Sequence, residues 1–335
     1  MNNLFDHTEF RENLFEFNIS SFSEKALQLF VYQYHENKVY KAYCDALRVD
    51  PSVIKKLTDI PYLPIGFFKT QAVKTGHFEP ELYFESSGTT SSINSRHYVK
   101  EVAIYRESFL AGFHKFYGDP SSWCIIGLLP SYLERQHSSL VMMVDDLIRR
   151  SDHPQSGFYL NEHELLFEQL KKLELAGQKV LLIGVTYALL DFAERFPMKL
   201  DHTVIMETGG MKGRREEITR ADVHKILQHG LGPQSIHSEY GMTELLSQAY
   251  SSGKGIFYPS DTMKILIREE DDPFEIHENG DKEYRGIINV IDLANVWSCA
   301  FIATEDAGIL YPGGSFEVTG RVNLSDIRGC SLMVV

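Results

Sequence analysis

A short turn in the first third of the chain is crowded with hydroxyl groups. It follows an apolar stretch at residues 82–84 that predicts a strand, and it consists of Ser86, Ser87, Gly88, Thr89 and Thr90. A strand that runs into such a turn offers backbone N–H groups and hydroxyls to a phosphate, and the glycine permits a close approach. Ordinary Ser/Thr turns have the same composition. Phosphate binding is therefore a hypothesis that other motifs must support.

A second candidate loop follows the apolar stretch at residues 203–206. It spans residues 207–215, and its glycines and best-placed basic residues are Gly209, Gly210, Lys212 and Arg214. Glycines with basic side chains beyond the carboxyl end of a strand suit an anion-binding crevice of an open α/β sheet. A solvated basic loop is the alternative interpretation.

A third motif, His237-Ser238-Glu239-Tyr240-Gly241-Met242-Thr243-Glu244, follows a predicted short strand at residues 234–237. A tyrosine ring can pack against a nucleobase, and the glycine lets the backbone turn beside it. The carboxylate of Glu244 offers the hard oxygen ligands that Mg²⁺ prefers. Tyr-Gly turns are common and most glutamates are solvated, so this motif alone is weak evidence.

Two further motifs lie near the C-terminus. Thr304-Glu305-Asp306 is expected to form a turn, where a carboxylate can accept both hydroxyls of a ribose, and Gly320-Arg321 offers a guanidinium to ribose or phosphate. Each motif by itself is more often a turn aspartate or a surface arginine.

The elements that position these motifs change in character along the chain. Between residues 82 and 237, uniformly apolar strands alternate with helices, which predicts parallel strands covered on both faces. After residue 255, short strands divided by polar turns predict a smaller antiparallel lobe. We therefore expect an α/β core at residues 1–255, a β-rich subdomain at 256–320 that completes the nucleotide site, and a short tail at 321–335.

Composition limits the class of protein. The 335 residues are 43% apolar, enough for one large domain or several lobes. The net charge of -13 repels nucleic acid, so a bound anion must be held by local groups. The first ten residues lack an apolar core and do not resemble a signal peptide. The longest apolar stretch, residues 180–190, is about half a membrane span. A cytoplasmic protein without membrane insertion is expected.

The four cysteines are scattered and none forms a CxxC pair, which favours free thiols in a reducing compartment. Apolar neighbours place Cys124 and Cys299 in the predicted core, and Cys44 lies on a helix predicted at residues 23–48. Cys330 differs, because it lies near the C-terminus between Gly329 and Ser331, with Arg328 close enough to favour the thiolate. Packing of Cys330 beside a terminal strand is the alternative.

The order of the five motifs is more specific than any one of them. It resembles the order found in the adenylate-forming ligases, and most closely that of their acyl-protein synthetase (LuxE) branch, the fatty-acid-activating component of bacterial bioluminescence reductase complexes. The resemblance extends to residues 60–69, 129–135 and 328–332 and spans nearly the whole chain. It implies the N-terminal domain of such a ligase: mainly parallel sheets flanked by helices, with a small β-rich subdomain.

The resemblance also implies roles for the motif residues. Residues 86–90 would hold the ATP phosphates, and the acyl group would enter a pocket beside Gly209 and Gly210. The adenine would lie against Tyr240, flanked by Gly241 and Thr243, and Glu244 would bind Mg²⁺. Asp306 would take the ribose hydroxyls, with Arg321 beside them. In this branch a cysteine close to the C-terminus accepts the acyl group as a thioester, a role that falls to Cys330.

The chain departs from the family pattern in three places. Ser91-Ser92-Ile93 stands where the phosphate loop usually continues with Gly and Lys, and Thr-Glu-Asp replaces Thr-Gly-Asp. The C-terminal lid, whose lysine stabilises the adenylation transition state in larger relatives, is expected to be absent or vestigial. Charge on the phosphate would then be neutralised by Mg²⁺ and by residues of the main body, for which the candidates are Lys69, Arg96, Lys212 and Arg214. Loss of ligase activity is the competing interpretation.

Three functions follow. The first is ATP-dependent activation of a fatty or other carboxylic acid to an acyl-adenylate, followed by thioester formation on Cys330 and transfer to a reductase, a carrier protein or another thiol. The second is a coenzyme A ligase of the phenylacetate type. The third is a catalytically silent scaffold that binds an acyl group or a nucleotide. The oligomeric state, including a homo-oligomer, is left open.

Overall fold

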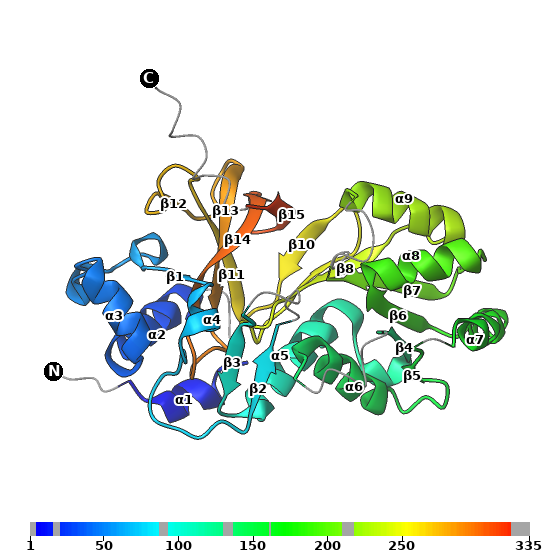
Figure 1. The fold of residues 1–335 in the computed structure, drawn as a ribbon, viewed down its shortest axis with the longest axis horizontal. Helices are drawn as coiled ribbons and strands as arrows, with labels where there is room; N and C mark the ends of the chain where they lie inside the picture. The colour runs from blue at the N-terminus through cyan, green and yellow to red at the C-terminus, as the bar shows by residue number, and fades with distance from the viewer. Residues whose placement is uncertain are drawn as a thin grey trace. The chain divides into compact units, whose positions relative to one another are not determined.

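The computed structural model describes residues 5–15, 21–86, 93–129, 137–160, 162–209 and 218–322. The chain divides into two compact units (Figure 1). We call residues 79–261 the central unit, and residues 1–78 together with 262–335 the terminal unit.

The central unit is built on one sheet, with strands in the order β10-β9-β8-β7-β6-β4-β5. Its parallel strands are β4 (Cys124–Leu128), β5 (Gly157–Phe158), β6 (Val180–Val185), β7 (Thr203–Thr208) and β8 (His237–Tyr240). Two antiparallel strands extend it, β9 (Ala249–Ser251) beside β8 and β10 (Ile256–Pro259) beside β9. Every residue of β4 and β6 is buried, as expected for parallel strands covered on both faces.

Helices cover the two faces of this sheet. Figure 1 shows α8 (Thr186–Arg195) and α9 (Arg220–Leu231) on one face, with α5 (Val102–Tyr117) and α6 (Ser139–Ser151) on the other. The remaining helices are α7 (His163–Leu175) and the 3-10 turn η4 (Pro120–Ser122). Side-chain caps fix two of the starts: Ser138 accepts from the amide of Val141, and Thr219 from that of Asp222. The alternation of strand and helix predicted from the sequence is confirmed.

A separate hairpin of the central unit precedes α5. Its strands are β2 (Leu82–Glu85) and β3 (Arg96–Val99), which pair antiparallel from Leu82 opposite Val99 to Glu85 opposite Arg96. The hairpin therefore carries the hydroxyl-rich segment between its two strands.

The terminal unit is the predicted β-rich lobe, enlarged by the N-terminal helices. Its antiparallel strands are β11 (Met263–Arg268), β12 (Ile276–His277), β13 (Tyr284–Asp292), β14 (Phe301–Leu310) and β15 (Phe316–Arg321). The short strand β1 (Leu63–Pro64) pairs parallel with β14. The helical elements are α1 (His7–Glu12), α2 (Phe22–Glu36), α3 (Lys38–Ala46), η2 (Pro51–Val53), η3 (Leu57–Asp59) and α4 (Phe67–Thr70).

The N-terminal residues pack with the late strands and not with the α/β core to which the sequence assigned them. The buried amide of Gln33 donates to the carbonyls of Asn295 (2.8 Å) and Val296 (3.1 Å). The rings of Phe30 and Tyr40 lie about 6 Å from that of Phe301. Such long-range contacts leave no local pattern in the sequence. The domain boundary predicted at residue 255, from the change in strand pattern, therefore did not include them.

The helix predicted at residues 23–48 is two helices that meet at Asn37. Asn37 has an extended backbone (ψ 106°), and its side chain accepts from the amide of Tyr40 at 3.0 Å, so it caps the second helix. Its Nδ2 also donates to the carbonyl of Ser298 at 2.9 Å. A tertiary hydrogen bond therefore stabilises the break.

Cys44, Cys124 and Cys299 are free and buried, in agreement with the sequence, whereas Cys330 lies outside the described residues. In the part of the chain that the structure describes, no helix has the length and apolarity needed to cross a membrane.

Candidate active site

Two neighbouring strands of the central unit end at the same edge of the sheet. β7 and β8 are parallel, with Met206 opposite His237 and Glu207 opposite Ser238. The Gly-Gly loop that begins at Gly209 and the Tyr240 motif therefore leave the carboxyl ends of adjacent strands, where ligands of open α/β sheets bind. Gly209 has φ 73°, a left-handed conformation that favours glycine. Gly210, Lys212 and Arg214 lie outside the described residues.

The β2–β3 hairpin presents the predicted phosphate loop. At its base the amide of Ser86 donates to the carbonyl of Ser95 (3.1 Å), and the Ser86 hydroxyl accepts from the amide of Ser95 (2.9 Å). Ser87, Gly88, Thr89 and Thr90 lie outside the described residues. The two hydrogen bonds close the loop immediately before these four residues.

A buried histidine connects this hairpin to the Tyr240 motif. His97 on β3 lies opposite Phe84, and its Nδ1 is 3.0 Å from the carbonyl oxygen of Thr243. Burial lowers the pKa of His97 to about 4, so the ring is neutral near pH 7 and its Nδ1–H donates to this carbonyl. Two motifs that are about 150 residues apart in the sequence thus share one hydrogen bond.

The Tyr240 motif forms a compact turn at the end of β8. Tyr240 is 8% exposed, and its ring centroid lies 5.9 Å from that of Phe257. Glu244 is also buried, at 5% exposure. A carboxylate at such a position needs a polar or metal partner, so its burial is compatible with the predicted role as a ligand of Mg²⁺.

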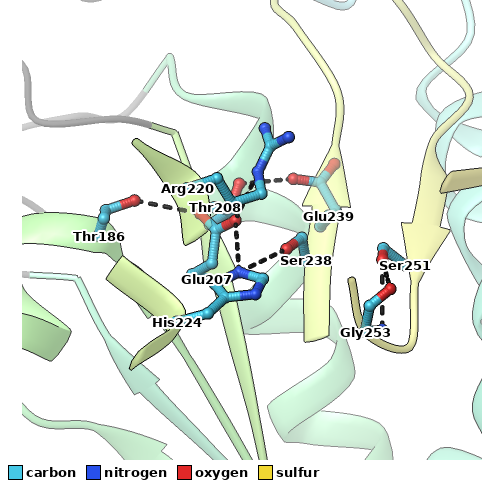
Figure 2. Close-up of polar contacts among 9 residues, drawn as sticks. All are labelled: Thr186, Glu207, Thr208, Arg220, His224, Ser238, Glu239, Ser251 and Gly253. Atoms are coloured by element: carbon cyan, nitrogen blue, oxygen red, sulfur yellow. Dashed lines mark hydrogen bonds and ion pairs between the residues drawn. The ribbon is translucent and has the colours of Figure 1, made fainter. Parts of the chain in front are cut away.

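Beneath the Gly-Gly loop, Glu207 is the centre of a polar network (Figure 2). Its Oε2 accepts from the hydroxyl of Thr186 at 3.1 Å. Its Oε1 lies 3.3 Å from Nε of Arg220 and 3.7 Å from Nε2 of His224. His224 in turn contacts the hydroxyl of Ser238 at 3.4 Å. One carboxylate therefore joins β7, α8 and the first turn of α9, with Ser238 of β8 reached through His224.

The charges of this network determine the protonation state of Glu207. Burial acts to raise the pKa of the carboxyl, but the hydrogen bond from His224, the positive charge of Arg220 and the hydroxyl of Ser238 outweigh it. The pKa of Glu207 is therefore below its usual value, and the group is ionised at neutral pH.

The neighbouring carboxyl of Glu239 is in the opposite state. Its Oε2 accepts a 2.6 Å hydrogen bond from the hydroxyl of Thr208 (Figure 2). Burial is the main reason that its pKa rises to about 7, and the negative charge of Glu207 adds to the rise. Near neutral pH the Glu239 carboxyl is thus present in both its neutral and its ionised form.

The last two motifs lie in the terminal unit. Asp306 on β14 is opposite Arg321 on β15, and Oδ1 of Asp306 lies 3.3 Å from Nε of Arg321. Asp306 is 8% exposed, whereas the Arg321 side chain is 69% exposed. The prediction that Thr304-Glu305-Asp306 forms a turn is wrong, since all three residues lie within β14. The register between β14 and β15 shifts after these residues, between Ala307 and Gly308, and the strand continues through the shift.

A partly buried arginine, Arg268, stabilises this part of β14. Arg268 on β11 donates to the carbonyl of Thr304 and to Oδ1 of Asn289, both at 2.6 Å. Burial lowers the pKa of Arg268 to about 10, which leaves it charged at neutral pH. The Thr304 hydroxyl accepts from the amide of Asp306 at 3.1 Å, so the arginine positions the strand at the aspartate.

Of the proposed phosphate-neutralising residues, two are described. Nε of Arg96 lies 3.2 Å from Oε1 of Glu85, and its guanidinium lies over the ring of Tyr83. Lys69 is exposed at the end of α4 in the terminal unit. Arg96 is therefore held at the base of the hydroxyl-rich hairpin.

Sequence reasoning assigned no role to Glu207, Glu239, His97, Arg220 or His224. A sequence signal was present for Glu207, because a glutamate in the apolar stretch Thr203–Thr208 needs a polar partner when the strand is buried. The partners on α9 and the contact of His97 depend on tertiary structure, and no local pattern indicates them.

The chain is similar to several known proteins. The family model described as acyl-protein synthetase, LuxE, matches residues 12–130. Two curated relatives are both named long-chain-fatty-acid–luciferin-component ligase. The Vibrio harveyi protein is 24% identical over 327 residues, covering 90% of this chain and 84% of the relative. The Aliivibrio fischeri protein is 23% identical over 333 residues, covering 91% and 85%.

A solved structure shares the fold. A 2-hydroxyisobutyryl-CoA ligase in the postadenylation state, in complex with 2-HIB-AMP, matches with a TM-score of 0.57 at 10% identity. The match covers 94% of this chain and 68% of that structure, whereas the chain spans 39% and 49% of two other solved ligases. The chain is therefore similar to the acyl-protein synthetase (LuxE) family over residues 12–130 and to two ligases over most of its length, and it has the fold of the adenylate-forming ligases.

Proposed function

We propose that this protein uses ATP and Mg²⁺ to activate a carboxylic acid as an acyl-adenylate and then accepts the acyl group on Cys330 as a thioester. The main support is that the Tyr240 motif lies beside the start of the Gly-Gly loop and is hydrogen-bonded to the hairpin that carries the hydroxyl-rich segment. β7 and β8 end side by side, and the bond from His97 to Thr243 joins the hydroxyl-rich hairpin to the same motif. The names of the two curated relatives are compatible with a fatty acid as substrate.

In the first step a carboxylate oxygen of the acid attacks the α-phosphorus of ATP. The bond from that phosphorus to the oxygen bridging to the β-phosphate breaks, and pyrophosphate leaves with both electrons of the bond. The loop that begins at Ser86 would hold the phosphates, and Tyr240 would lie against the adenine. Mg²⁺ held by Glu244 would neutralise phosphate charge, together with Lys212, Arg214 and Arg96.

In the second step the thiolate of Cys330 attacks the acyl carbon. The bond between that carbon and the phosphate oxygen breaks, and AMP leaves. The thioester can then pass the acyl group to a reductase, a carrier protein or a small thiol. Asp306 and Arg321 would bind the ribose hydroxyls during both steps.

Carboxylate-dependent exchange of labelled pyrophosphate into ATP tests the first step. We expect exchange that requires both the acid and Mg²⁺. A purified protein that binds ATP but shows no exchange with any acid would instead be the catalytically silent scaffold.

Thioester formation needs a separate measurement. Mass spectrometry after incubation with ATP and an acid should show a hydroxylamine-sensitive adduct that is lost in Cys330→Ala and retained in Ser331→Ala. An adduct that persists in Cys330→Ala would exclude Cys330 as the acceptor. Exchange without any adduct, together with acyl-CoA formed on addition of coenzyme A, would identify a coenzyme A ligase.

A further inference from the structure

A polar cluster lies beside the Tyr240 motif, on the face of the sheet that α5 covers. Glu239 on β8 is directly opposite Tyr250 on β9, so the two side chains project from the same face. The Tyr250 ring centroid lies 5.2 Å from that of Phe116 and 5.6 Å from that of Tyr117, both on α5. A Cβ built on Gly112 of the same helix would lie 3.3 Å from the Tyr250 ring. Glu239 and Tyr250 thus belong to the layer between this edge of the sheet and α5.

Gln248 completes the cluster. A Cβ built on Gly241 would lie within 3.0 Å of Oε1 of Glu239 and 3.5 Å from Cγ of Gln248. The carboxyl and the amide side chain therefore approach the same point of the Gly241 backbone. We call Glu239, Gln248 and Tyr250 the Glu239 cluster.

Two atoms of this cluster are buried without a hydrogen-bond partner among the residues that the structure describes. They are Oε1 of Gln248 and the hydroxyl of Tyr250. The two residues are 4% and 2% exposed. Nε2 of Gln248 donates to the carbonyl of Leu246 at 3.3 Å, which orients the amide and leaves its oxygen as a free acceptor. Unpaired buried polar atoms cost about 1–3 kcal/mol each and are rare in folded proteins. Each of the two atoms therefore lacks a hydrogen-bond partner that a bound molecule could supply.

The cluster adjoins Gly209, beside which the family resemblance places the acyl group, and Gly241, which the resemblance places beside the adenine. The Glu239 carboxyl is bonded to Thr208, the residue immediately before Gly209, and it lies against the backbone of Gly241. Of the hydrogen bonds among the described residues, the carboxyl accepts only the one from Thr208, and it does so through Oε2. Its Oε1 faces Gly241.

The chemistry of these atoms selects for a donor. An amide oxygen accepts hydrogen bonds only, an ionised carboxyl oxygen also accepts, and a tyrosine hydroxyl can do either. An unsubstituted alkyl chain would leave the amide oxygen of Gln248 and the hydroxyl of Tyr250 unpaired, whereas a hydroxyl or an amine would satisfy them. Sites built around such groups discriminate strongly against analogues that lack the hydrogen-bonding atom.

We propose that the Glu239 cluster determines which acid is activated, and that the preferred acid carries a hydrogen-bond donor, a hydroxyl or an amine, on its acyl part. This inference rests on the proposed adenylation activity and specifies its substrate class. It departs from the unsubstituted long-chain acids that the names of the curated relatives indicate.

The neighbours of Glu239 support this assignment. Burial is the largest cause, and the charge of Glu239 the next, of the raised pKa of Tyr105, Tyr117 and Tyr250. With its own pKa near 7, the carboxyl can accept a hydrogen bond when ionised and donate one when protonated. A hydroxyl group on the acid suits both forms, and an ammonium group suits the ionised form.

The test is pyrophosphate exchange with a panel of acids of equal chain length: octanoic acid, its 2-, 3- and 8-hydroxy derivatives, and the matching amino acids. The wild-type protein should give a kcat/KM at least about 10-fold higher for one substituted acid than for octanoic acid. The hydroxy and amino arms identify which donor is used.

Two variants locate the selectivity. Tyr250→Phe removes only the hydroxyl, and Glu239→Leu replaces the carboxyl by an apolar group. Each should reduce the preference for the substituted acid over octanoic acid at least several-fold, mainly through KM for the substituted acid. Glu168→Gln, an exposed glutamate on α7, is the control, and thermal melting shows whether each variant is folded.

Two results would overturn the proposal. One is equal use of octanoic acid and of every substituted acid by the wild-type protein. The other is a preference that persists unchanged in Tyr250→Phe, the variant that conserves shape. Both results leave adenylation itself intact. Absence of exchange with every acid would instead remove the proposed function, and this inference with it.

Discussion

Oε1 of Glu207, at the end of β7, lies 3.3 Å from Nε of Arg220, the first residue of α9. This ion pair holds together the two ends of the Gly-Gly loop, because Gly209 follows β7 within two residues and Thr219 caps α9. The segments that enter and leave the loop are thereby joined.

Glu207→Gln removes this charge and leaves Arg220 and the buried His224 without their anion. We expect a loss of about 2–4 kcal/mol in the free energy of unfolding, near the lower range for broken buried pairs because Arg220 is partly exposed. Urea denaturation measures the loss. Because folding lowers the pKa of Glu207, its contribution to the free energy of unfolding depends on pH. The contribution is complete above the ordinary pKa of 4.5 and is lost as the pH falls through the folded-state pKa. If the free energies of unfolding of the wild-type protein and the variant differ by the same amount at pH 7 and at pH 3, this role of Glu207 is contradicted.

Glu239 should give the opposite dependence on pH. Its pKa is raised from 4.5 to about 7 in the folded protein, so folding favours the protonated form. The stabilisation is complete below about pH 4.5 and is lost as the pH rises through 7, by about 3 kcal/mol in total. The uncharged variant Glu239→Gln should therefore lose less stability than the wild-type protein between pH 5 and pH 8. Parallel curves for the two proteins in urea denaturation would show that Glu239 does not titrate in this range.

His97 should act as a positioning residue for ATP. His97→Ala removes the hydrogen bond to the carbonyl of Thr243 and the link between the hairpin and the Tyr240 motif. We expect KM for ATP in the exchange reaction to rise about 10-fold, equivalent to roughly 1.4 kcal/mol, with a smaller change in kcat. His97→Asn, which can still donate, should recover part of the loss. A decrease in thermal stability with an unchanged KM would indicate a packing role only.

The strands that could be predicted from the sequence are those whose burial is uniform. β4, β6 and β7 are apolar along most of their length, and their positions in the α/β alternation follow from that pattern. β3, β9 and β10 were missed, because Arg96–Val99 carries two polar residues, Ala249–Ser251 has three residues, and Ile256–Pro259 ends in proline. Their pairing partners, and not their composition, make them strands.

The site was predictable to the extent that it consists of loops in a known order. Placing Gly209 and Tyr240 at neighbouring strand ends required only that parallel strands share an edge. The residues that support the site were not predictable in this way. His97 reaches Thr243 across 146 positions, and the contact of Glu207 with Arg220 depends on how α9 packs against β7. Hydrogen bonds of this kind are decided by tertiary structure.

Glu244 is expected to bind Mg²⁺ through its carboxylate. Glu244→Gln keeps the size of the side chain but removes the charge, so exchange should fall by at least about 100-fold at 1 mM Mg²⁺ while the thermal midpoint changes little. Raising the Mg²⁺ concentration should recover part of the activity. An exchange rate equal to that of the wild-type protein would remove Glu244 from the metal site.

Gly241 is the residue of the Tyr240 motif whose requirement can be tested most directly. Its φ is not in the left-handed region, so the backbone would accept an L-residue. What excludes a side chain is Glu239, whose Oε1 would lie within 3.0 Å of an added Cβ. Because this oxygen is the far end of a flexible side chain, Gly241→Ala should cost only about 1 kcal/mol in the free energy of unfolding, through the disturbed hydrogen bond from Thr208. Gly157→Ala, where an added Cβ meets no atom within 4 Å, is the matched control.

The double variant Gly241→Ala/Glu239→Ala separates this explanation from others. If the clash with Glu239 is the whole cause, adding Gly241→Ala to Glu239→Ala should cost almost nothing, and the coupling energy should equal the penalty of Gly241→Ala in the wild-type background. An undiminished penalty in the double variant would mean that the glycine is required by something other than the carboxyl beside it. In that case the contact between Glu239 and the Gly241 backbone would not be the cause of the penalty.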